Sequence, residues 1–256
     1  MIGRRTPLGD AQHWKYRARP GSDFVASGFA IDAVVRLVAD RRPATILEVG
    51  AGIGTLTEAI LDARERASLA GTQVAVEGEP FCLAELDANL GERLADVTVV
   101  PLAADVPASV GPYDLVVIDG GSVEDLLPAD RHRWTPDDER AEVAAWIDRL
   151  APRAVVIVEN VRSRQRAHLE ALATRPFVHE HLRPLDATPG YHRYRFDPTS
   201  RERLAARARD RIRDLWFPRG YRAAKRAHRA ILRRPLAPRT AVAPGDPAYN
   251  ADAPPP

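Results

Sequence analysis

Three glycines at alternate positions carry the strongest chemical signal in the sequence. Gly50, Gly52 and Gly54 follow the apolar run Thr45–Val49, and a helical pattern begins directly after them at Thr55. Glycine permits the tight turn that joins a strand to a helix, and it leaves bare backbone that a ligand can approach. The N–H groups at the start of the helix would meet the polar end of that ligand. The segment therefore predicts a ligand-binding loop.

The spacing of these glycines separates two kinds of ligand. A dinucleotide site carries Gly-x-Gly-x-x-Gly, but the last position counted from Gly50 is Thr55. The order Glu-x-Gly-x-Gly-x-Gly, which begins at Glu48, instead resembles motif I of the class I S-adenosylmethionine-dependent methyltransferases, in an O-methyltransferase-like form. The resemblance covers most of residues 23–197. It implies S-adenosylmethionine (SAM) as cofactor, with Glu48 orienting its methionine end.

The resemblance also implies two acidic contacts to the nucleoside. In this family an acidic residue that ends the second strand binds the ribose hydroxyls, and Glu77 has that place. A carboxylate offers two acceptor oxygens to a vicinal diol. Glu79 is the second candidate, although a turn residue would also explain it. An acidic residue after the third strand contacts the adenine amino group, and Asp105 matches it; a helix or turn cap explains Asp105 almost as well.

Polar residues also end the fourth and fifth strands. Asp119 lies in an Ile-Asp-Gly segment that resembles small-molecule O-methyltransferases. In the metal-dependent catechol and caffeoyl-CoA types, an Asp-Asn pair on the fifth strand completes a Mg²⁺ site, and Glu159 and Asn160 take its place here. The resemblance thus implies Mg²⁺ held by Asp119, Glu159 and Asn160, whose oxygens are the ligands this ion prefers. A bound metal would lower the pKa of the acceptor hydroxyl.

Two departures from the metal-dependent pattern leave a metal-free alternative open. Glutamate is longer than the aspartate of the family, and Ser122 stands where the catechol type carries a catalytic lysine. Without a metal, Asp119 is the expected general base. His132, in the long polar loop over residues 120–137, is the second choice. Trp134 in that loop would either stack on the acceptor or pack on the protein.

These residues must be positioned by alternating strands and helices. Nearly continuous apolar runs predict five parallel strands covered on both faces, at 45–49, 73–77, 97–100, 114–118 and 154–158. Amphipathic stretches predict the helices around them, at 55–69, 81–94, 139–150 and 163–174. Period-two alternation at 177–183 and 191–196 predicts an antiparallel hairpin. The expected fold class is α/β, a doubly wound Rossmann-like sheet of seven strands, with five parallel strands plus a C-terminal antiparallel hairpin.

A further helix is expected ahead of the first strand. Ser22 is its predicted N-cap, and the helix runs through Ala39. Four of its apolar residues share the inward face: Phe29, Val34, Leu37 and Val38. We therefore expect four parts in the chain, in order an N-terminal arm (1–21), a methyltransferase domain (22–199), a basic helical extension (200–238) and a disordered Pro/Ala-rich tail (239–256).

Charge is distributed unevenly over these parts. The formal net charge of the chain is +2, yet residues 201–239 hold 14 Lys and Arg against 3 Asp and Glu. This extension has three interpretations. It is an accessory helix packed on the domain, an interfacial helix that binds an anionic membrane surface through 200–234, or an RNA-binding segment. RNA ranks last because no recognisable RNA-binding module accompanies the charge.

The amino-acid composition limits the class of protein to which the chain can belong. Hydrophobic residues at 45% and charged residues at 28% are typical of globular proteins, and no apolar run is long enough to span a bilayer. A single cysteine, Cys82, excludes internal disulfides and a cysteine-cluster metal site. We expect a cytoplasmic, or membrane-peripheral, protein. The predicted function is SAM-dependent methylation of a hydroxyl on a small molecule such as a sugar or secondary metabolite. An RNA methyltransferase and a non-catalytic cofactor-binding domain are the alternatives, and oligomeric state stays open.

Overall fold

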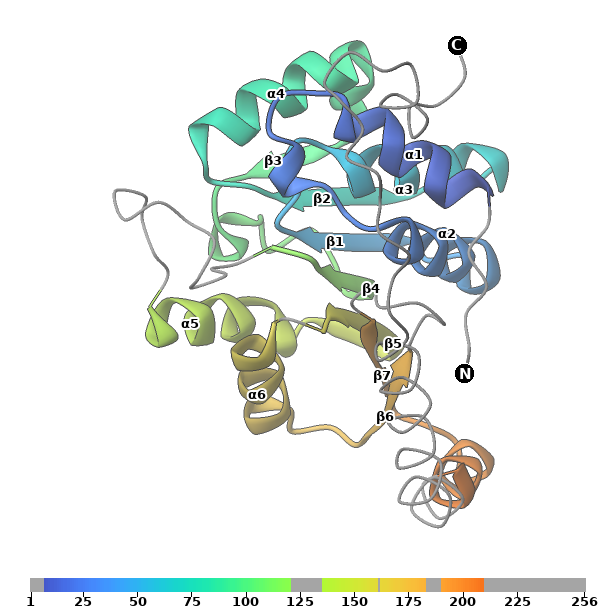
Figure 1. Ribbon diagram of the computed structural model, residues 1–256. Helices are drawn as coiled ribbons and strands as arrows, with labels where there is room; N and C mark the ends of the chain where they lie inside the picture. Colours follow the sequence, from blue (N-terminus) through green and yellow to red (C-terminus); the bar gives the residue numbers. More distant parts are fainter. Residues whose placement is uncertain (1–6, 121–134, 161, 183–189, 210–256) are drawn as a thin grey trace, which may run out of the picture. The chain divides into compact units, whose positions relative to one another are not determined.

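The computed structural model describes residues 7–120, 135–160, 162–182 and 190–209 (Figure 1). The chain forms two compact units, Met1–Arg203 and Leu204–Pro256. All the strands found in the described residues belong to the first unit. In the second unit the described residues, 204–209, are helical. No helix in the described part of the chain combines the length and the apolar character needed to cross a bilayer.

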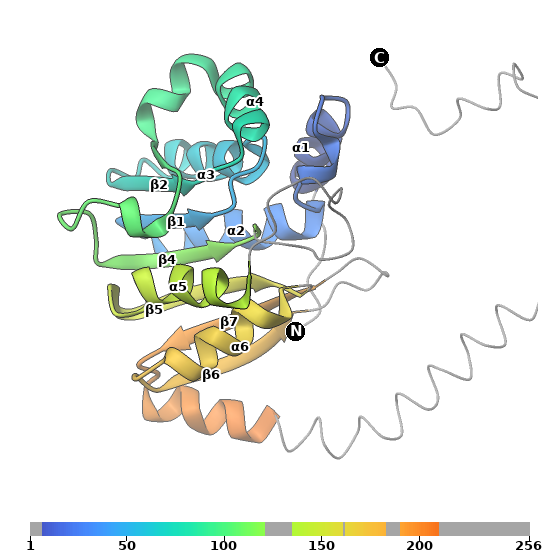
Figure 2. The same ribbon diagram turned by 90° about the vertical axis from the view of Figure 1, so that its left-hand side faces the viewer.

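A mixed sheet forms the centre of the first unit (Figure 2). Its strands are β1 (Thr45–Val49), β2 (Thr72–Val76), β3 (Thr98–Val100), β4 (Tyr113–Ile118), β5 (Leu150–Glu159), β6 (Phe177–Leu182) and β7 (Tyr191–Phe196). They lie in the order β3-β2-β1-β4-β5-β7-β6. The first five are parallel, and β7 runs antiparallel to both β5 and β6. The predicted seven-stranded, doubly wound sheet with its terminal hairpin is confirmed.

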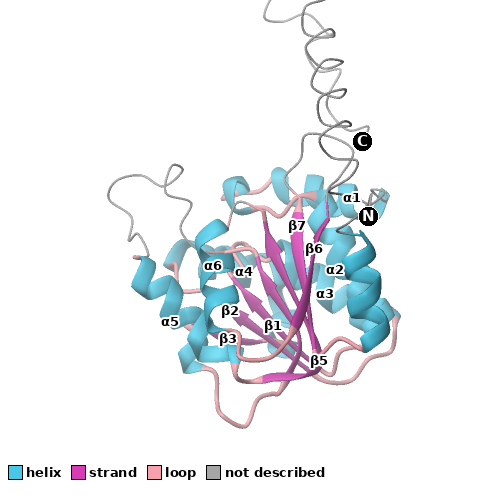
Figure 3. Ribbon diagram, turned by 90° about the horizontal axis from the view of Figure 1, so that it is seen from below, coloured by secondary structure: helices cyan, strands magenta, loops and turns pink. Residues whose placement is uncertain are grey.

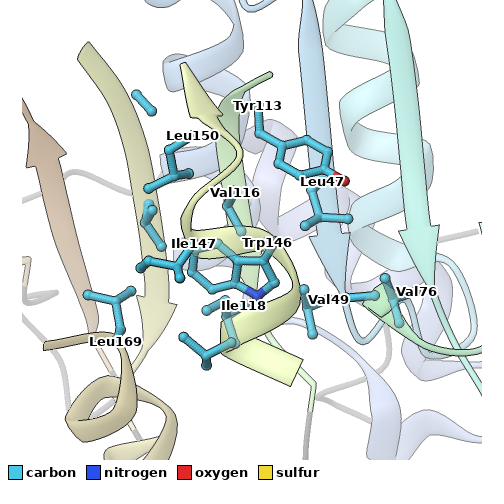
Figure 4. Packing of buried hydrophobic residues seen from close by; sticks show 14 of the residues in the cluster. Leu47, Val49, Val76, Tyr113, Val116, Ile118, Trp146, Ile147, Leu150 and Leu169 are labelled. Atoms are coloured by element: carbon cyan, nitrogen blue, oxygen red, sulfur yellow. The ribbon is translucent and has the colours of Figure 1, made fainter. Parts of the chain in front are cut away.

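Helices cover both faces of this sheet (Figure 3). They are α1 (Pro7–Arg17), α2 (Gly28–Arg41), α3 (Thr55–Arg66), α4 (Pro80–Leu90), α5 (Pro136–Ile147) and α6 (Ser163–Leu172). Short 3-10 turns form at η1 (Ser22–Phe24), η2 (Gly91–Asp96) and η3 (Ala103–Asp105). Helices α2 and α3 pack on the face that carries Ile46, Val117 and Ile157. Helices α5 and α6 pack on the opposite face, around the buried side chain of Trp146 (Figure 4).

The helix before β1 begins later than predicted. Ser27, rather than Ser22, caps it, with its Oγ accepting a hydrogen bond of 3.2 Å from the N–H of Ala30. Val25 has extended backbone, so the turn that starts at Ser22 ends at Phe24 and cannot continue into α2. The prediction of Ser22 as the cap was therefore wrong. The four residues predicted to face inward, Phe29, Val34, Leu37 and Val38, are all buried, as expected.

Candidate functional site

The glycine loop and the end of β4 are held together by direct backbone contact. A Cβ added to Gly50 would lie 2.0 Å from the Cα of Gly120, and Gly50 has a φ of +84° that disfavours any other residue. The carbonyl oxygen of Val49 accepts hydrogen bonds from the N–H groups of Asp119 (3.1 Å) and Gly120 (2.9 Å). The loop after β1 and the end of β4 therefore have a fixed relative position, which brings Asp119 beside the glycines.

The other two glycines of the loop also have neighbours within the protein. A Cβ on Gly52 would lie 2.9 Å from the carbonyl oxygen of Phe24. A Cβ on Gly54 would lie 2.5 Å from a methyl carbon of Leu90 on α4. Internal packing thus accounts for part of the glycine pattern. The binding of a ligand by the bare backbone over residues 50–54 stays a prediction.

Glu77 follows β2 and turns toward the glycine loop. Its Oε2 accepts a hydrogen bond of 2.8 Å from the N–H of Gly52, and its Oε1 accepts one of 2.9 Å from the N–H of Glu79. Burial raises the pKa of this carboxyl, and the backbone donors partly offset the shift. Glu79 itself caps α4, because its Oε2 accepts from the N–H of Cys82 at 2.8 Å. Of the two candidates for the ribose contact, only Glu77 bonds to the loop.

Glu48 is completely buried in β1, beneath the loop. Neither of its carboxylate oxygens has a well-aligned hydrogen-bond partner among the described residues. Burial raises its pKa to about 8, the nearby Thr57 hydroxyl opposes the shift, and the charges of Asp119 and Glu77 add to it. A buried carboxyl without a well-aligned hydrogen bond is costly in free energy, so such a group in a native fold calls for an explanation beyond packing.

Asp119 follows β4 and meets the first residue of β7. The Tyr191 hydroxyl donates a hydrogen bond of 2.5 Å to Asp119 Oδ1. Tyr191 is buried, and its ring lies 6.4 Å from that of Phe29 on α2. Burial raises the pKa of Asp119, while the Tyr191 hydroxyl and the Arg162 charge act in the opposite direction. Tyr191 thus positions the carboxyl that the sequence predicts as general base.

Glu159, at the end of β5, pairs with a guanidinium. The Nε of Arg162 lies 3.2 Å from Glu159 Oε2, and Arg162 Nη2 donates to the main-chain oxygen of Asp119 at 2.7 Å. Burial and the charge of Asp119 raise the pKa of Glu159 to about 7, and Arg162 opposes that shift. Three groups from the ends of β4, β5 and the start of α6 therefore form one charged cluster.

Asn160 belongs to the other face of the sheet. Its Oδ1 lies 2.9 Å from Nε2 of His192, whose register partner Val158 packs on the α5/α6 face. Side chains of successive strand residues point to opposite faces, so Asn160 turns away from Glu159. The nearest groups to His192 include Arg166 of α6, at 2.8 Å.

The predicted magnesium ligands do not form a metal site. Glu159 is paired with Arg162, Asp119 accepts from Tyr191, and Asn160 bonds on the opposite face. Within residues 7–120, 135–160, 162–182 and 190–209, no group of three or more His, Cys, Asp or Glu side chains could hold a metal ion. The donor set thus does not fit Mg²⁺, because the Arg162 guanidinium lies against the Glu159 carboxylate and the main-chain oxygen of Asp119.

The region after β3 contains Asp105 together with a residue that the sequence did not single out. Asp105 is exposed and ends η3, whose first N–H, that of Ala103, donates to Glu142 Oε1 at 3.1 Å. Glu142 is buried on α5, and burial together with the nearby Asp105 raises its pKa to about 7, although the Ala103 bond opposes this. Glu142 fixes the turn that carries Asp105, whose contact to adenine stays a prediction.

Other residues of the loop and the hairpin take no part in the contacts described above. His132, the second choice for general base, lies outside the described residues, as do Ser122 and Trp134. His179 lies on β6, where its Nε2 is 2.7 Å from Nδ1 of His192. His181 of the same strand stacks on the His192 ring at 4.1 Å.

Neither a family model nor a curated relative matches the chain. Its similarity to known proteins lies in its three-dimensional structure. The methyltransferase PaMTH1 of Podospora anserina, bound to S-adenosylhomocysteine (SAH), is 16% identical with a TM-score of 0.54, over 77% of this chain and 91% of that one. The O-methyltransferase TomG of Streptomyces achromogenes, involved in tomaymycin synthesis and bound to SAM, is 18% identical with a TM-score of 0.53, over 77% and 93%.

A third structure gives the same result. The O-methyltransferase of Bacillus cereus, in complex with SAH, is 16% identical with a TM-score of 0.53, over 76% of this chain and 92% of that one. Together with the strand order, these matches decide the fold. The chain has the class I methyltransferase fold. In this fold the ligand crevice lies at the carboxyl ends of the strands, where the order of the sheet reverses between β1 and β4.

The class I fold explains why sequence analysis missed three residues. Arg162, Tyr191 and Glu142 reach the strand ends from α6, β7 and α5. Tyr191 pairs with Glu159 in the register of β7 on β5, a pairing that no local pattern gives. A usable signal existed for Asn160, which follows β5 directly, because neighbouring residues of an extended segment point to opposite faces.

Proposed function

We propose that the protein transfers the methyl group of SAM to an oxygen atom of a small molecule. The observation that carries the proposal is the position of Glu77, whose Oε2 lies 2.8 Å from the N–H of Gly52 in the glycine loop. The fold adds support, since TomG and the Bacillus cereus enzyme, both similar in structure, are O-methyltransferases bound to SAM or SAH. Binding of SAM and the chemical class of the acceptor are the two parts of the proposal that need testing.

The residues after β1 and β2 fit the chemistry of SAM. A carboxylate can accept about four hydrogen bonds, so Glu77 has acceptor capacity left for two ribose hydroxyls. The completely buried carboxyl of Glu48 lies beneath the loop and would orient the methionine end. Asp105 would contact the adenine amino group. Bound SAM carries a positive sulfonium, which would favour the charged forms of Glu48, Glu77 and Asp119 and so oppose the effect of burial on their pKa values.

The chemistry requires alignment and a base. When bound, SAM supplies an activated methyl group, and in the transfer an O–C bond forms as the S–C bond breaks. Asp119 would accept the proton of the acceptor hydroxyl, and Tyr191 would hold its carboxylate in place through the 2.5 Å hydrogen bond. The glycine contact between Gly50 and Gly120 fixes the base relative to the loop. Since methyl transfer is an in-line displacement, this fixed geometry would supply much of the rate enhancement.

Isothermal titration calorimetry with SAM and with SAH tests the proposal on the full chain. We expect saturable binding of both, and an at least tenfold weaker binding in the Glu77→Ala variant, because that change removes two charge-assisted hydrogen bonds. Absence of binding by the folded wild-type chain would refute the proposal. If SAM binds, a radiolabelled methyl-transfer screen over catechols, sugars and hydroxy acids would identify the acceptor class.

The remaining predictions concern other parts of the chain. All but 200–209 of the basic extension lies outside the described residues, so its binding to an anionic membrane surface or to RNA stays a prediction. A cytoplasmic location likewise stays a prediction.

A further inference from the structure

We propose that the guanidinium of Arg162 replaces the divalent cation that the resemblance implies, and that the site therefore works without a metal. The inference rests on the proposed function for the reaction concerned. What it adds is that a guanidinium, and not a metal ion, supplies the positive charge beside Glu159 and Asp119. Arg162 touches both residues: its Nε lies 3.2 Å from Glu159 Oε2, and its Nη2 donates to the main-chain oxygen of Asp119 at 2.7 Å.

The position of Arg162 is fixed by the start of α6. Arg162 is the N-cap residue of α6, and Gln165 in the first turn donates from Nε2 to the main-chain oxygen of Gly120 at 2.9 Å. Two side chains from one helical turn thus bond to the carbonyls of Asp119 and Gly120. The same two residues donate their N–H groups to Val49. The guanidinium is therefore part of a tightly connected frame that includes the glycine loop.

Arg162 also has the chemical properties that the role needs. A guanidinium keeps its charge at all physiological pH values and donates from several nitrogens in one plane. Its side chain is only 10% exposed, so its charge is poorly screened by water at the two carboxylates. A divalent cation placed between Asp119 and Glu159 would meet this positive charge at close range and be repelled.

The third predicted ligand does not compensate for this repulsion. Asn160 would have to leave His192, with Oδ1 and Nε2 now 2.9 Å apart, and turn to the opposite face of the sheet. Mg²⁺ requires near-octahedral oxygen coordination and binds through carboxylates that are free to approach it. In this chain the Glu159 carboxylate is paired with an arginine and the Asp119 carboxylate accepts a hydrogen bond from a tyrosine. The Asn160 amide lies on the opposite face of the sheet.

Arg162 is in this scheme a positioning residue. It holds the Glu159 carboxylate and the main chain of Asp119 in place, as a cation would, while Asp119 accepts the proton. The charge of Asp119 already acts on Glu159, so removal of the guanidinium leaves two interacting carboxylates without its positive charge, and such a pair attracts a divalent cation. If Arg162 had only a structural role, its removal would not be expected to create a site for a divalent cation.

Mn²⁺ binding to the full chain, followed by electron paramagnetic resonance, tests the proposal. We expect no stoichiometric binding by the wild type or by Arg162→Lys at millimolar Mn²⁺. We expect Arg162→Met to bind one Mn²⁺ at least about tenfold more tightly than the wild type. Adding Asp119→Asn to Arg162→Met should abolish that gain. Arg162→Gln replaces Arg162→Met if circular dichroism shows that the latter does not fold.

Two results would overturn the proposal. One is stoichiometric Mn²⁺ binding by the wild type that EDTA removes, and the other is a folded neutral variant at position 162 that gains no affinity for Mn²⁺. A methyl-transfer assay adds a second readout, in which wild-type activity should be the same with EDTA and with Mg²⁺. These outcomes are distinct from failure of the proposed function, which would appear as absent SAM binding and leave the Mn²⁺ measurements unaffected.

Discussion

Two halves of the candidate site are built in different ways. The glycine half comprises Glu48, the loop 50–54 and Glu77, and its contacts are made largely by backbone N–H groups. The carboxylate half comprises Asp119, Glu159, Arg162 and Tyr191, and its contacts are made by side chains from separate elements. The first half matches the pattern of the class I methyltransferases. In the second, Arg162 lies against Glu159 and the main chain of Asp119.

This difference shows which parts of a site can change while a fold is kept. A loop whose glycines pack against backbone, as Gly50 does against Gly120, cannot accept other residues. A counter-ion between two carboxylates can be either a metal or a guanidinium, because both supply positive charge. In this chain the glycine half therefore tolerates little change of residue type, whereas the carboxylate half depends chiefly on the balance of charge.

The largest expected effect is a loss of folding free energy in the glycine half. Two substitutions distinguish the part due to steric contact from the part due to backbone strain. Gly50→Ala places a methyl group 2.0 Å from Gly120 at a φ of +84°, and we expect it to cost about 3–5 kcal/mol of folding free energy. Gly91→Ala is the matched control, since Gly91 also has a positive φ, of +54°, but no described atom lies within 4 Å of the added Cβ. Strain alone should cost about 1–3 kcal/mol there. Equal losses in urea denaturation would contradict the importance of the Gly50–Gly120 contact.

A second prediction concerns the pH dependence of stability. Burial raises the folded-state pKa of Glu48 from 4.5 to about 8. A raised pKa contributes stability that is fully present below pH 4.5 and is lost as pH rises through about 8. Glu48→Gln should remove this dependence, so that the variant keeps a stability of a few kcal/mol that the wild type loses by pH 9.

Glu58 serves as a control, because its pKa is shifted in the opposite direction from that of Glu48. Burial raises its pKa, but hydrogen bonds from Lys15 (2.7 Å) and Gln12 (2.6 Å) outweigh burial and lower it. Its contribution is present above the ordinary pKa of a glutamate and is lost as pH falls through the lowered value. Glu58→Gln should therefore flatten only the acid limb of a plot of Tm against pH. A Glu48→Gln variant with an unchanged alkaline limb would refute the assignment.

A third prediction compares two neighbouring acids of the glycine half. Glu77→Gln keeps the shape of the side chain but removes its charge, and we expect the Kd for SAM to rise about 10- to 100-fold. Glu79→Gln weakens the cap of α4 instead, so stability should fall by about 1 kcal/mol while the Kd stays unchanged. Calorimetry and thermal unfolding on both variants separate the two roles. A larger effect on SAM binding at Glu79 would reverse the assignment.

The smallest expected effect lies in the carboxylate half. Tyr191→Phe removes the hydroxyl that donates to Asp119, and we expect kcat/KM for the acceptor to fall about tenfold with the Kd for SAM unchanged. Tyr194→Phe removes a similar hydrogen bond, of 2.6 Å to Glu170 Oε1, away from the site. It should leave kcat/KM as in the wild type. Equal activity losses in both variants would show that the hairpin matters only for stability.

The fold was predictable from sequence because each element carries its own local signal. The strand 45–49 and the strand 191–196 have the predicted bounds, since apolar runs and period-two alternation reflect burial directly. The start of α2 was mistaken because Ser22 and Ser27 are equally good caps. The choice between them depends on the extended backbone of Val25, which packing determines.

The candidate site was predictable only in part, for a physical reason. Glu77 and the glycines are adjacent to strands whose ends the sequence identifies. Arg162 contributes through a side chain that reaches across from α6, and Tyr191 through the register of β7 on β5. Contacts of this kind depend on tertiary structure, and a single sequence has no periodic pattern that records them.

The hairpin at the edge of the sheet has a consequence for how far this protein could be shortened. Neighbouring residues of β7 serve opposite faces, with Tyr191 bonded to Asp119 and His192 beside Asn160. A slip of one residue in the pairing of β7 would exchange the phenol and the imidazole. A chain that ended before Phe177 would keep all five parallel strands and the glycine loop, yet Asp119 would have no phenolic donor. The last two strands thus complete the candidate site as well as the sheet.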